Sequence, residues 1–565
     1  MQLLFNFIFL LFVPFAHIHV EGELGQRLQQ NFNRLEESKY QPQNVFLTMQ
    51  QSGDWPGDTE GRTILALTLD AQATGRTPRY LDEIIGLLPS HMNEKGYMGP
   101  VFPHFAHEQQ LSGNGWMLRG LCEYYLWKPS PAVLSHIRHI SRNLFLPHKG
   151  RYARYPISPD ERRQDTGAES GSTVGQLDGW QLSSDIGCVF IGMDGLIQAY
   201  GILHDEDLRP VIDEMVGRFL QIDLVGIKAQ THATLTALRG LLRLADLTGR
   251  QALAREAEQR FLLYVRNGMT ENFENYNWFN RFDTWTEPCA IVDSYMLAMQ
   301  LWQHTHKEQY LQWAEKIYYN ALCRTQRHNG GFGLDNCPGR AAGTAELRVH
   351  APEAHWCCTM RGGEGLARAA QYTVRQEGRR VWISTLRPLK AQLPLEGQAT
   401  LGLRVATAYP MDTTCSIVIT QADGGSPIDL HLPCHPWMER PTVMLNGREI
   451  KVKRRQGFLR IRHAFQAGDS LAYRFSQRLY WDGTQNATNT LPRQRRAFYG
   501  PLMLQLDGTT VTSPLPHDAR LEKTGSQAFG IIGTSLRLTP VYHMMSPHLW
   551  QKQQQGHPIL FDTEE

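Results

Sequence analysis

Three cysteines and one glutamate are spaced so that they could share a metal ion. Cys357 and Cys358 are adjacent, and nearly seventy residues earlier Cys289 follows Glu287 by two positions. Adjacent cysteines do not readily form a disulfide with each other, because the bridge needs Cα atoms about 4.4–6.8 Å apart and a fixed S–S torsion. Zinc accepts thiolate and carboxylate ligands and keeps a bound thiol ionised. The pattern therefore predicts a zinc site formed by these four residues.

A second carboxylate and an aromatic stretch precede this cluster. Glu271 stands sixteen residues before Glu287, and residues 273–282 between them are aromatic and rich in hydrogen-bonding groups, as the lining of a sugar site would be. Retaining glycosidases place a proton donor and a nucleophile, usually a second carboxylate, about 5 Å apart. A zinc-held thiolate could replace that carboxylate, because sulfur is a strong nucleophile. Spacing alone leaves a closed, purely structural zinc site equally open.

The composition is that of a soluble globular protein. The chain has 565 residues, of which 42% are hydrophobic and 20% charged, and its formal net charge is +2. This gives no basic field for nucleic acid, so we expect no nucleic-acid partner. The odd count of nine cysteines fits a metal cluster better than a disulfide framework. Five others are predicted to be isolated buried thiols: Cys122, Cys188, Cys323, Cys415 and Cys434.

A short apolar run opens the chain at residues 3–15. It predicts a secretory signal peptide over residues 1–22, although no Lys or Arg precedes the run. The run is too short to cross a bilayer, and no later segment is long enough. We therefore expect an exported protein, periplasmic or secreted, with no membrane span.

A unit of helix, turn and second helix recurs along the first two thirds of the chain. Apolar residues return at helical spacing in each unit, and the turn often carries Thr-Gly or another helix stop. The units cover residues 65–85, 118–140, 193–216, 238–261 and 296–318, and residues 363–372 can supply one helix of a sixth. Such repeats bury a continuous core only by stacking on their neighbours, so the pattern predicts an (α/α)6 toroid over residues 23–380.

The periodicity changes from helical to alternating after residue 379. Short runs rich in β-branched and aromatic residues follow, separated by Gly, Pro, Asp and Asn turns. Asp423-Gly424-Gly425 and Asn446-Gly447 are plausible hairpin turns. The pattern predicts a C-terminal β-sandwich domain over residues 381–565.

These motifs together resemble glycoside hydrolase family 127, the β-L-arabinofuranosidase-like family. The resemblance rests on the Glu-x-Cys motif at Glu287, on Trp356-Cys357-Cys358-Thr359, and on stretches of the strand region such as 443–447 and 496–502. It covers most of the chain after the predicted signal peptide. It implies an α/α toroid followed by β-sandwich modules, and a glycosidase that depends on zinc and cysteine.

The resemblance also implies roles for individual residues. Cys357 matches the nucleophile that forms a thioglycosyl intermediate, Glu271 matches the acid/base, and His232 matches a histidine that contacts the sugar. The zinc ligands that it implies are Glu287, Cys289, Cys357 and Cys358. Residues 359–363 depart from the commoner Gly- and Asn-containing run of the family, so sugar contacts beside the nucleophile are expected to differ.

Aromatic and basic residues near the cluster are candidate substrate contacts. Trp278 is predicted to stack on a sugar ring, and Arg361 to pair with a substrate carboxylate. Trp285, Trp356 and Tyr276 are further stacking candidates.

The function expected is a zinc-dependent, retaining, exo-acting glycoside hydrolase. It would release a terminal β-L-arabinofuranose or a related rare sugar from an oligosaccharide of plant cell-wall pectin. Soft thiolate ligands favour zinc over iron. Two alternatives stay open: a toroid polysaccharide lyase or unsaturated-uronide hydrolase, in which Cys357 would be dispensable, and a non-catalytic carbohydrate-binding protein with a structural zinc. The sequence specifies no oligomeric state.

Overall fold

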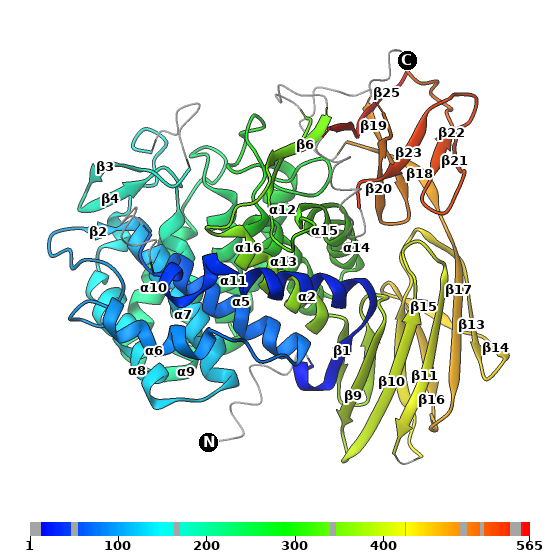
Figure 1. Ribbon diagram of the computed structural model, residues 1–565, viewed down its shortest axis with the longest axis horizontal. Coiled ribbons are helices and arrows are strands. Elements are labelled where there is room, and N and C mark those ends of the chain that lie inside the picture. The colour runs from blue at the N-terminus through cyan, green and yellow to red at the C-terminus, as the bar shows by residue number, and fades with distance from the viewer. Residues whose placement is uncertain are drawn as a thin grey trace.

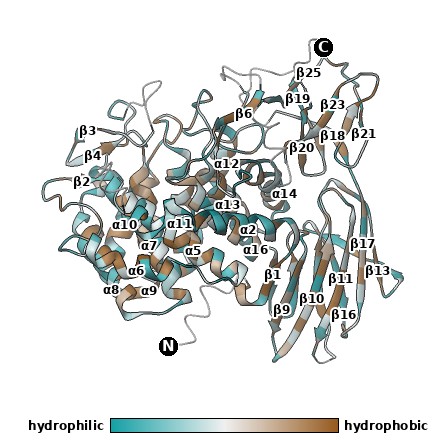
Figure 2. Cartoon of the chain, viewed as in Figure 1, coloured by the Kyte–Doolittle hydropathy of each residue, from teal (hydrophilic) through white to brown (hydrophobic). Residues whose placement is uncertain are grey.

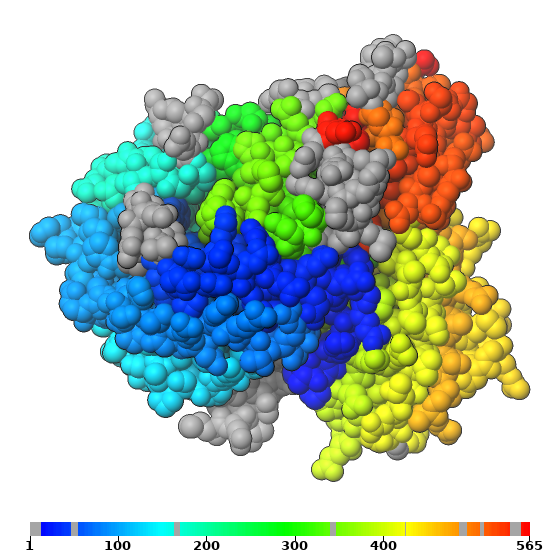
Figure 3. Space-filling view, viewed as in Figure 1, coloured from blue at the N-terminus to red at the C-terminus, as the bar shows by residue number. Residues whose placement is uncertain are grey.

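The computed structural model describes residues 13–46, 55–162, 170–339, 346–423, 425–484, 494–508, 514–542 and 555–564. Helices occupy the first two thirds of the chain and strands the last third, and the two regions lie side by side (Figure 1). In Figure 3 the strand region appears as two bodies beside the helices, one yellow and one orange to red. The predicted order, a helical region followed by a strand region, is confirmed.

Six helices of the described chain contact one another in a closed ring. Each packs against the next, and the last packs against the first. They are almost entirely buried, because neighbours and an outer layer of helices cover them. In ring order they are α5 (Asp58–Thr74), α7 (Glu108–Trp127), α9 (Ile191–Leu203), α11 (Thr231–Thr248), α13 (Pro288–Thr305) and α16 (Cys358–Gln371). This is the inner layer expected of stacked helical hairpins.

A second helix packs on the outside of each ring helix. Following the ring order, these are α6 (Leu81–His91), α8 (Pro131–His139), α10 (Arg209–Phe219), α12 (Gln251–Asn267), α14 (Glu308–Ile317) and α2 (Gly22–Leu35). The outer helices bury one face only; α12, for example, buries Leu253, Ala257 and Phe261 at helical spacing. Because α2 comes from the start of the chain and packs on α16, the two ends of the helical region close the ring together.

Two sheets follow the helices, and their strands alternate buried and exposed residues. Alternation is complete in β9, and Figure 2 shows bands of hydrophobic and hydrophilic colour along β9 to β11. The first sheet has the order β1 (Ile18–Val20), β9 (Leu389–Leu395), β10 (Ala399–Thr407), β11 (Thr414–Ala422), β17 (Ser470–Gln477), β13 (Met438–Leu445) and β14 (Arg448–Ile450). The second has the order β15 (Lys453–Arg455), β16 (Phe458–His463), β12 (Ile428–Pro433), β8 (Arg380–Ile383) and β7 (Val374–Glu377).

Most of the strands after residue 478 form a third sheet. Its order is β18 (Leu479–Gly483), β19 (Gln494–Tyr499), β20 (Leu502–Leu506), β23 (Arg537–Pro540), β22 (Phe529–Ile531) and β21 (Leu521–Lys523), and β25 (Phe561–Asp562) also pairs with β19. The sequence pattern treated residues 381–565 as one β-sandwich, whereas the structure places most of these strands in three sheets and β24 (His557–Pro558) in a small fourth sheet. Alternation identifies strands but not their partners, so this division could not be read from the pattern.

Two small sheets lie among the loops of the helical region. One contains β3 (Thr173–Leu177), β4 (Trp180–Ser183) and β2 (Ala106–His107), and the other contains β5 (Leu334–Asn336), β6 (Glu346–Ala351) and β24 (His557–Pro558). The loop after β4 carries Asp185, and the loop after β6 leads to Cys357. The small sheets therefore fix two loops whose side chains reach the site described below.

The start of the chain joins the first sheet. Ile18 and Val20 of β1 are buried, and β1 pairs with β9 through Ile18↔Ala391 and Val20↔Leu389. The predicted signal peptide thus falls partly outside the described residues, at 1–12, and partly on this strand. None of the described helices has the length and apolar character to span a membrane.

Candidate active site

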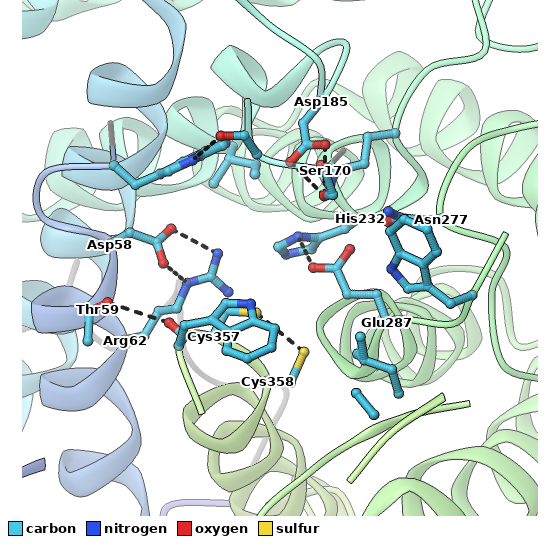
Figure 4. A pocket seen from close by; sticks show the side chains of 18 of the residues that line it. Asp58, Thr59, Arg62, Ser170, Asp185, His232, Asn277, Glu287, Cys357 and Cys358 are labelled. Atoms are coloured by element: carbon cyan, nitrogen blue, oxygen red, sulfur yellow. Dashed lines mark hydrogen bonds and ion pairs between the residues drawn. The ribbon is translucent and has the colours of Figure 1, made fainter. Parts of the chain in front are cut away.

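A cavity of about 640 Å³ opens at one end of the helical ring. Five ring helices, α5, α9, α11, α13 and α16, begin at this cavity, because the first residues of each or their immediate neighbours line it. The amino ends of helices carry partial positive charge, so their convergence favours anionic side chains and ligands here. Its volume lies within the range of small-molecule sites. Figure 4 shows the side chains that point into it.

The four predicted zinc ligands come together in this cavity. One ligand atom from each of Glu287, Cys289, Cys357 and Cys358 lies within 4.8 Å of the other three. Cys358 Sγ is 3.7 Å from Cys289 Sγ and 3.4 Å from Cys357 Sγ. Sulfur atoms bound tetrahedrally to zinc at about 2.3 Å would lie about 3.8 Å apart. The donor set therefore fits a tetrahedral zinc ion.

Two further observations fit a cation at this place. Glu287 Oε2 is buried and has no hydrogen-bond partner among the described residues, so it is available as a ligand. Burial raises the pKa of the Cys289 and Cys358 thiols, and a hydrogen bond with Cys289 raises the pKa of Cys357. These three thiols lie close together in space, so they need a nearby positive charge before they can all ionise.

Cys357 differs from the other two cysteines of the cluster in its exposure. It is half-buried and lines the cavity, whereas Cys289 and Cys358 are buried. It is also the N-cap residue of α16, where the helix dipole stabilises a thiolate. The neighbouring Trp356, which also lines the cavity, is 49% exposed. Of the three sulfur atoms, that of Cys357 is therefore the one best placed to meet a ligand.

Arg62 and His232 contact the cluster from two sides (Figure 4). Arg62 Nη1 donates to Cys289 Sγ at 3.3 Å, and Asp58 fixes the guanidinium through contacts of 2.6 and 2.9 Å. His232 Nδ1 lies 3.2 Å from Glu287 Oε1, and His232 lines the cavity. These contacts orient two ligands and place a positive charge beside the thiols.

Trp278 and Arg361 are not placed to touch a ligand in the cavity. Trp278 is fully buried and packs edge-on, at 5.7 Å, against Trp285, which does line the cavity. Arg361 is buried, with Nη2 2.5 Å from Asp293 Oδ1, and its guanidinium lies 4.4 Å from the Trp116 ring. Both predicted contacts are therefore corrected: these side chains support the site from behind. The periodicity of aromatic and basic residues does not show which side chain faces a cavity.

Glu271, the predicted acid/base, lies outside the residues that line the cavity. It is 3% exposed, its Oε2 is 3.6 Å from Arg496 Nε, and its backbone carbonyl accepts a hydrogen bond from Arg496 Nη1 at 2.9 Å. Arg496 belongs to β19 of the third sheet. In this structure Glu271 therefore joins the loop before α13 to the third sheet.

A carboxyl group that the sequence did not single out, Asp185, lines the cavity instead. Figure 4 shows it across the cavity from Cys357, beside Ser170, whose hydroxyl lies 3.0 and 3.2 Å from its two oxygens. Burial, and next the charge of Glu287, raises the pKa of Asp185 to about 7. A carboxyl group that stays protonated near neutral pH can donate a proton to a leaving group. No sequence motif marks this residue, which stands in a short loop.

Arg62 and Asp58 are also residues that sequence reasoning missed. Their i, i+4 spacing on α5 is a signal for an ordinary helical ion pair. Only the packing of α5 against α16 brings the pair to the thiol cluster.

Two sequence models of a single family match consecutive parts of the chain. "Beta-L-arabinofuranosidase, GH127 catalytic domain" matches residues 203–371, and "Beta-L-arabinofuranosidase, GH127 middle domain" matches residues 381–476. The chain belongs to glycoside hydrolase family 127. It is therefore a glycosidase, which confirms the resemblance seen in the sequence. GH127 membership leaves the lyase and non-catalytic alternatives without support.

Solved GH127 structures share the fold of this chain. A GH127 β-arabinofuranosidase is 12% identical, with 98% of both chains covered and a TM-score of 0.71. A GH127 β-L-arabinofuranosidase from Geobacillus stearothermophilus T6 is 13% identical, with 97% of this chain and 100% of that chain covered and a TM-score of 0.70. At these identities the likeness shows the fold. No curated protein sequence matches the chain.

Proposed function

We propose that this GH127 glycosidase is a retaining, exo-acting enzyme whose nucleophile is Cys357. Glu287, Cys289, Cys357 and Cys358 would hold a zinc ion. The observation that carries the proposal is the half-buried Cys357 thiol at the cavity surface, backed by two buried thiols and a carboxylate. A site with only a structural role would have no need to expose one ligand to a cavity of this size.

The residues of the cavity can divide the reaction into two displacements. Zinc, when bound, supplies the positive charge that keeps the thiols ionised at neutral pH. Cys357 Sγ attacks the anomeric carbon while the bond to the leaving oxygen breaks, and that oxygen takes a proton from a carboxylic acid. A water molecule then gives its proton to the resulting carboxylate and attacks the same carbon, which releases Cys357 and the sugar with retained configuration.

Asp185 is the better placed of two candidates for the acid/base. It lines the cavity and faces Cys357 across it, and its pKa of about 7 keeps a proton available. Glu271 was assigned this role by family resemblance, but it is held by Arg496 outside the lining. A general acid must reach the leaving oxygen within hydrogen-bond distance, so geometry favours Asp185.

We propose a terminal β-L-arabinofuranose, or a related rare sugar of pectic glycans, as the group released. The descriptions of both matching GH127 models support a β-L-arabinofuranosidase. Trp285, stacked on His350 at 5.3 Å, and the exposed Trp356 offer aromatic surfaces to a sugar ring in the cavity. A set of 4-nitrophenyl furanosides and pyranosides would identify the sugar.

The test of the nucleophile is Cys357→Ala, with Cys434→Ala, a buried thiol in the strand region, as control. We expect turnover of 4-nitrophenyl β-L-arabinofuranoside to fall at least about 10³-fold in the first variant and to stay unchanged in the second. Circular dichroism would show that both fold, and mass spectrometry of the wild type with a slow substrate would detect a glycosyl group on Cys357. A folded, fully active Cys357→Ala variant would show that the cluster is structural.

Export stays part of the proposal. The apolar run at residues 3–15 supports a signal peptide, but β1 begins at Ile18 and completes the edge of the first sheet. A cleavage before Ile18 would keep this strand, whereas the predicted boundary at residue 22 would remove it. Determining the amino-terminal residue of the secreted protein by mass spectrometry distinguishes the two.

A further inference from the structure

A second cavity, of about 320 Å³, lies between the end of α13 and the second sheet. We name it the junction cavity. Trp302 and His306, at the carboxyl end of α13, line one side, and residues of β8, β12 and β16 line the other. The active-site cluster lies at the opposite end of the same helix, and 18 residues of α-helix span about 27 Å. The junction cavity is therefore separate from the active site.

Strand register builds one wall of the junction cavity from a row of polar and aromatic side chains. Trp382 of β8 pairs with Arg375 of β7 on one side and with His431 of β12 on the other. His431 in turn pairs with Arg460 of β16, and Arg460 with Lys453 of β15. Partners in register share a face of the sheet, so the row crosses the whole sheet. This face carries polar residues, whereas the alternating residues of the same strands are buried in the core.

Two buried polar atoms of residues that line the junction cavity have no hydrogen-bond partner among the described residues. They are Asp429 Oδ1 and His431 Nε2. A buried polar atom left unpaired costs about 1–3 kcal/mol, so such atoms usually meet a water molecule or a ligand. The pair contains an acceptor, the Asp429 oxygen, and an imidazole nitrogen that can donate or accept. Hydroxyl groups, which donate and accept, match this pair.

The charges at the junction cavity add a preference for an anionic group. Arg380 is paired with Glu377 at 2.8 Å, and Arg460 with Asp429 at 2.6 Å. Arg455 also lines the cavity, is exposed, and forms no ion pair with any residue that the structure describes. A free guanidinium recognises a planar carboxylate through two parallel hydrogen bonds.

We propose that the junction cavity binds a uronic acid residue of an acidic glycan. The rings of Trp302, Trp382 and Phe458 give the sugar an apolar wall, the unpaired atoms of Asp429 and His431 meet its hydroxyl groups, and Arg455 meets its carboxylate. Such a site would hold an acidic polysaccharide on the enzyme while the active site acts on a terminal sugar elsewhere. Tethering of this kind raises the local concentration of substrate ends.

Calorimetric titration of the full chain with α-1,4-linked trigalacturonate tests the proposal. The variants are Arg455→Gln, which removes the unpaired cation, and His431→Phe, which keeps a ring beside Trp382 but removes the nitrogen. The control is Arg474→Gln, an exposed arginine of the first sheet. We expect Arg455→Gln and His431→Phe each to weaken trigalacturonate binding about tenfold or more, with no change in the control. Turnover of a small 4-nitrophenyl glycoside should stay within twofold of the wild type in all three.

Three results would overturn the inference. The first is absence of trigalacturonate binding to the wild type, and the second is equal binding by the wild type and Arg455→Gln. The third is binding of inorganic sulfate as tight as that of trigalacturonate, which would make the cavity a simple anion site. Because the titration measures binding and needs no turnover, it stands apart from any failure of the proposed catalytic mechanism.

Discussion

Asp185 and Glu287 are two carboxyl groups in one cavity that ionise differently because their neighbours differ. Burial raises the pKa of Asp185 to about 7, with a further contribution from the charge of Glu287. Burial acts in the same direction on Glu287, but the charge and hydrogen bond of His232, together with the charge of Arg62 and a hydrogen bond with Cys289, lower its pKa. Carboxyl groups whose pKa values are pushed apart are suited to different tasks, here the proton transfer proposed for Asp185 and the metal binding proposed for Glu287.

The pKa of Asp185 predicts how activity depends on pH. The first displacement needs protonated Asp185, so kcat/KM should fall as pH rises through about 7. Burial is the main cause of this pKa and does not depend on a metal. Asp185→Asn should lower turnover by about 10²–10⁴-fold and abolish the alkaline limb, whereas Glu271→Gln should keep that limb. A pH–rate profile with a chromogenic glycoside measures the fall of kcat/KM at alkaline pH. If Glu271→Gln and not Asp185→Asn abolishes that fall, the acid/base is Glu271.

Arg62 predicts an effect on metal affinity. Its guanidinium donates to Cys289 and places a positive charge beside the thiols. Arg62→Gln should therefore weaken zinc binding about 10–100-fold, as loss of a partner of a metal ligand usually does. Competition with a chromogenic chelator measures the affinity, and Arg404→Gln, on the exposed face of β10, is the control. Equal affinities in the two variants would contradict the role given to Arg62.

At this scale the sequence predicts a cluster of ligand-type residues better than individual contacts. The grouping of Glu287, Cys289, Cys357 and Cys358 was predictable because coordination demands particular residue types, which leave a visible pattern. Asp185, which lines the cavity opposite Cys357, was not predictable from the sequence, because any aspartate in a loop can become buried once distant segments pack over it. The contact of Glu271 with Arg496 was not predictable for the same reason, since Arg496 stands more than two hundred residues away.

Helix positions were predictable at the scale of elements, because each ring helix carries its own hydrophobic period. The units expected at 65–85 and 238–261 match the pairs α5–α6 and α11–α12. The pairing of α2 with α16 was not predicted, because no local pattern links segments at opposite ends of the helical region. The convergence of helix amino ends on the cavity follows from the direction of the ring helices, which only the closed ring determines.

Strand β1 predicts a stability contribution from the start of the chain. Ile18 is buried against the first sheet and His19 beside it is exposed. Ile18→Ala should lower the free energy of unfolding by about 2–5 kcal/mol, because it removes buried methyl groups and leaves a cavity. His19→Ala is the control and should change it by less than about 0.5 kcal/mol. Urea denaturation followed by fluorescence compares them, and equal midpoints would show that β1 does not belong to the cooperative fold.

At the scale of the whole molecule, the third sheet is fastened to the helical region by buried polar contacts. Asn320, just after α14, donates to the carbonyl oxygen of Pro501 at 2.9 Å and accepts from the amide of Met503 at 2.8 Å. Arg496 and Glu271 form a second link nearby. These links place the third sheet against the loops that precede α13 and the proposed metal ligands Glu287 and Cys289.

Asn320→Ala tests how much this fastening contributes. The change leaves a buried carbonyl and a buried amide without their partners, at about 1–3 kcal/mol each. We expect a lower midpoint of thermal unfolding and faster proteolysis of the third sheet. Turnover of a small substrate, measured well below that midpoint, should change less. Asn329→Ala, at an exposed position, is the control. An unchanged midpoint in Asn320→Ala would show that other contacts hold the sheet.

Closure of the ring by α2 and α16 has a consequence for the timing of synthesis. Asn31 of α2 donates to the carbonyl oxygen of Thr359, directly after the cysteine pair. During translation α2 is synthesised early, whereas α16 is complete only after some 370 residues. Glu287 and Cys289 leave the ribosome well before Cys357 and Cys358. A nascent chain therefore carries half of the proposed metal ligands while the other half is untranslated. A translation product that stops before α16 has neither a closed ring nor the proposed nucleophile, so we expect incomplete chains to be inactive from the outset.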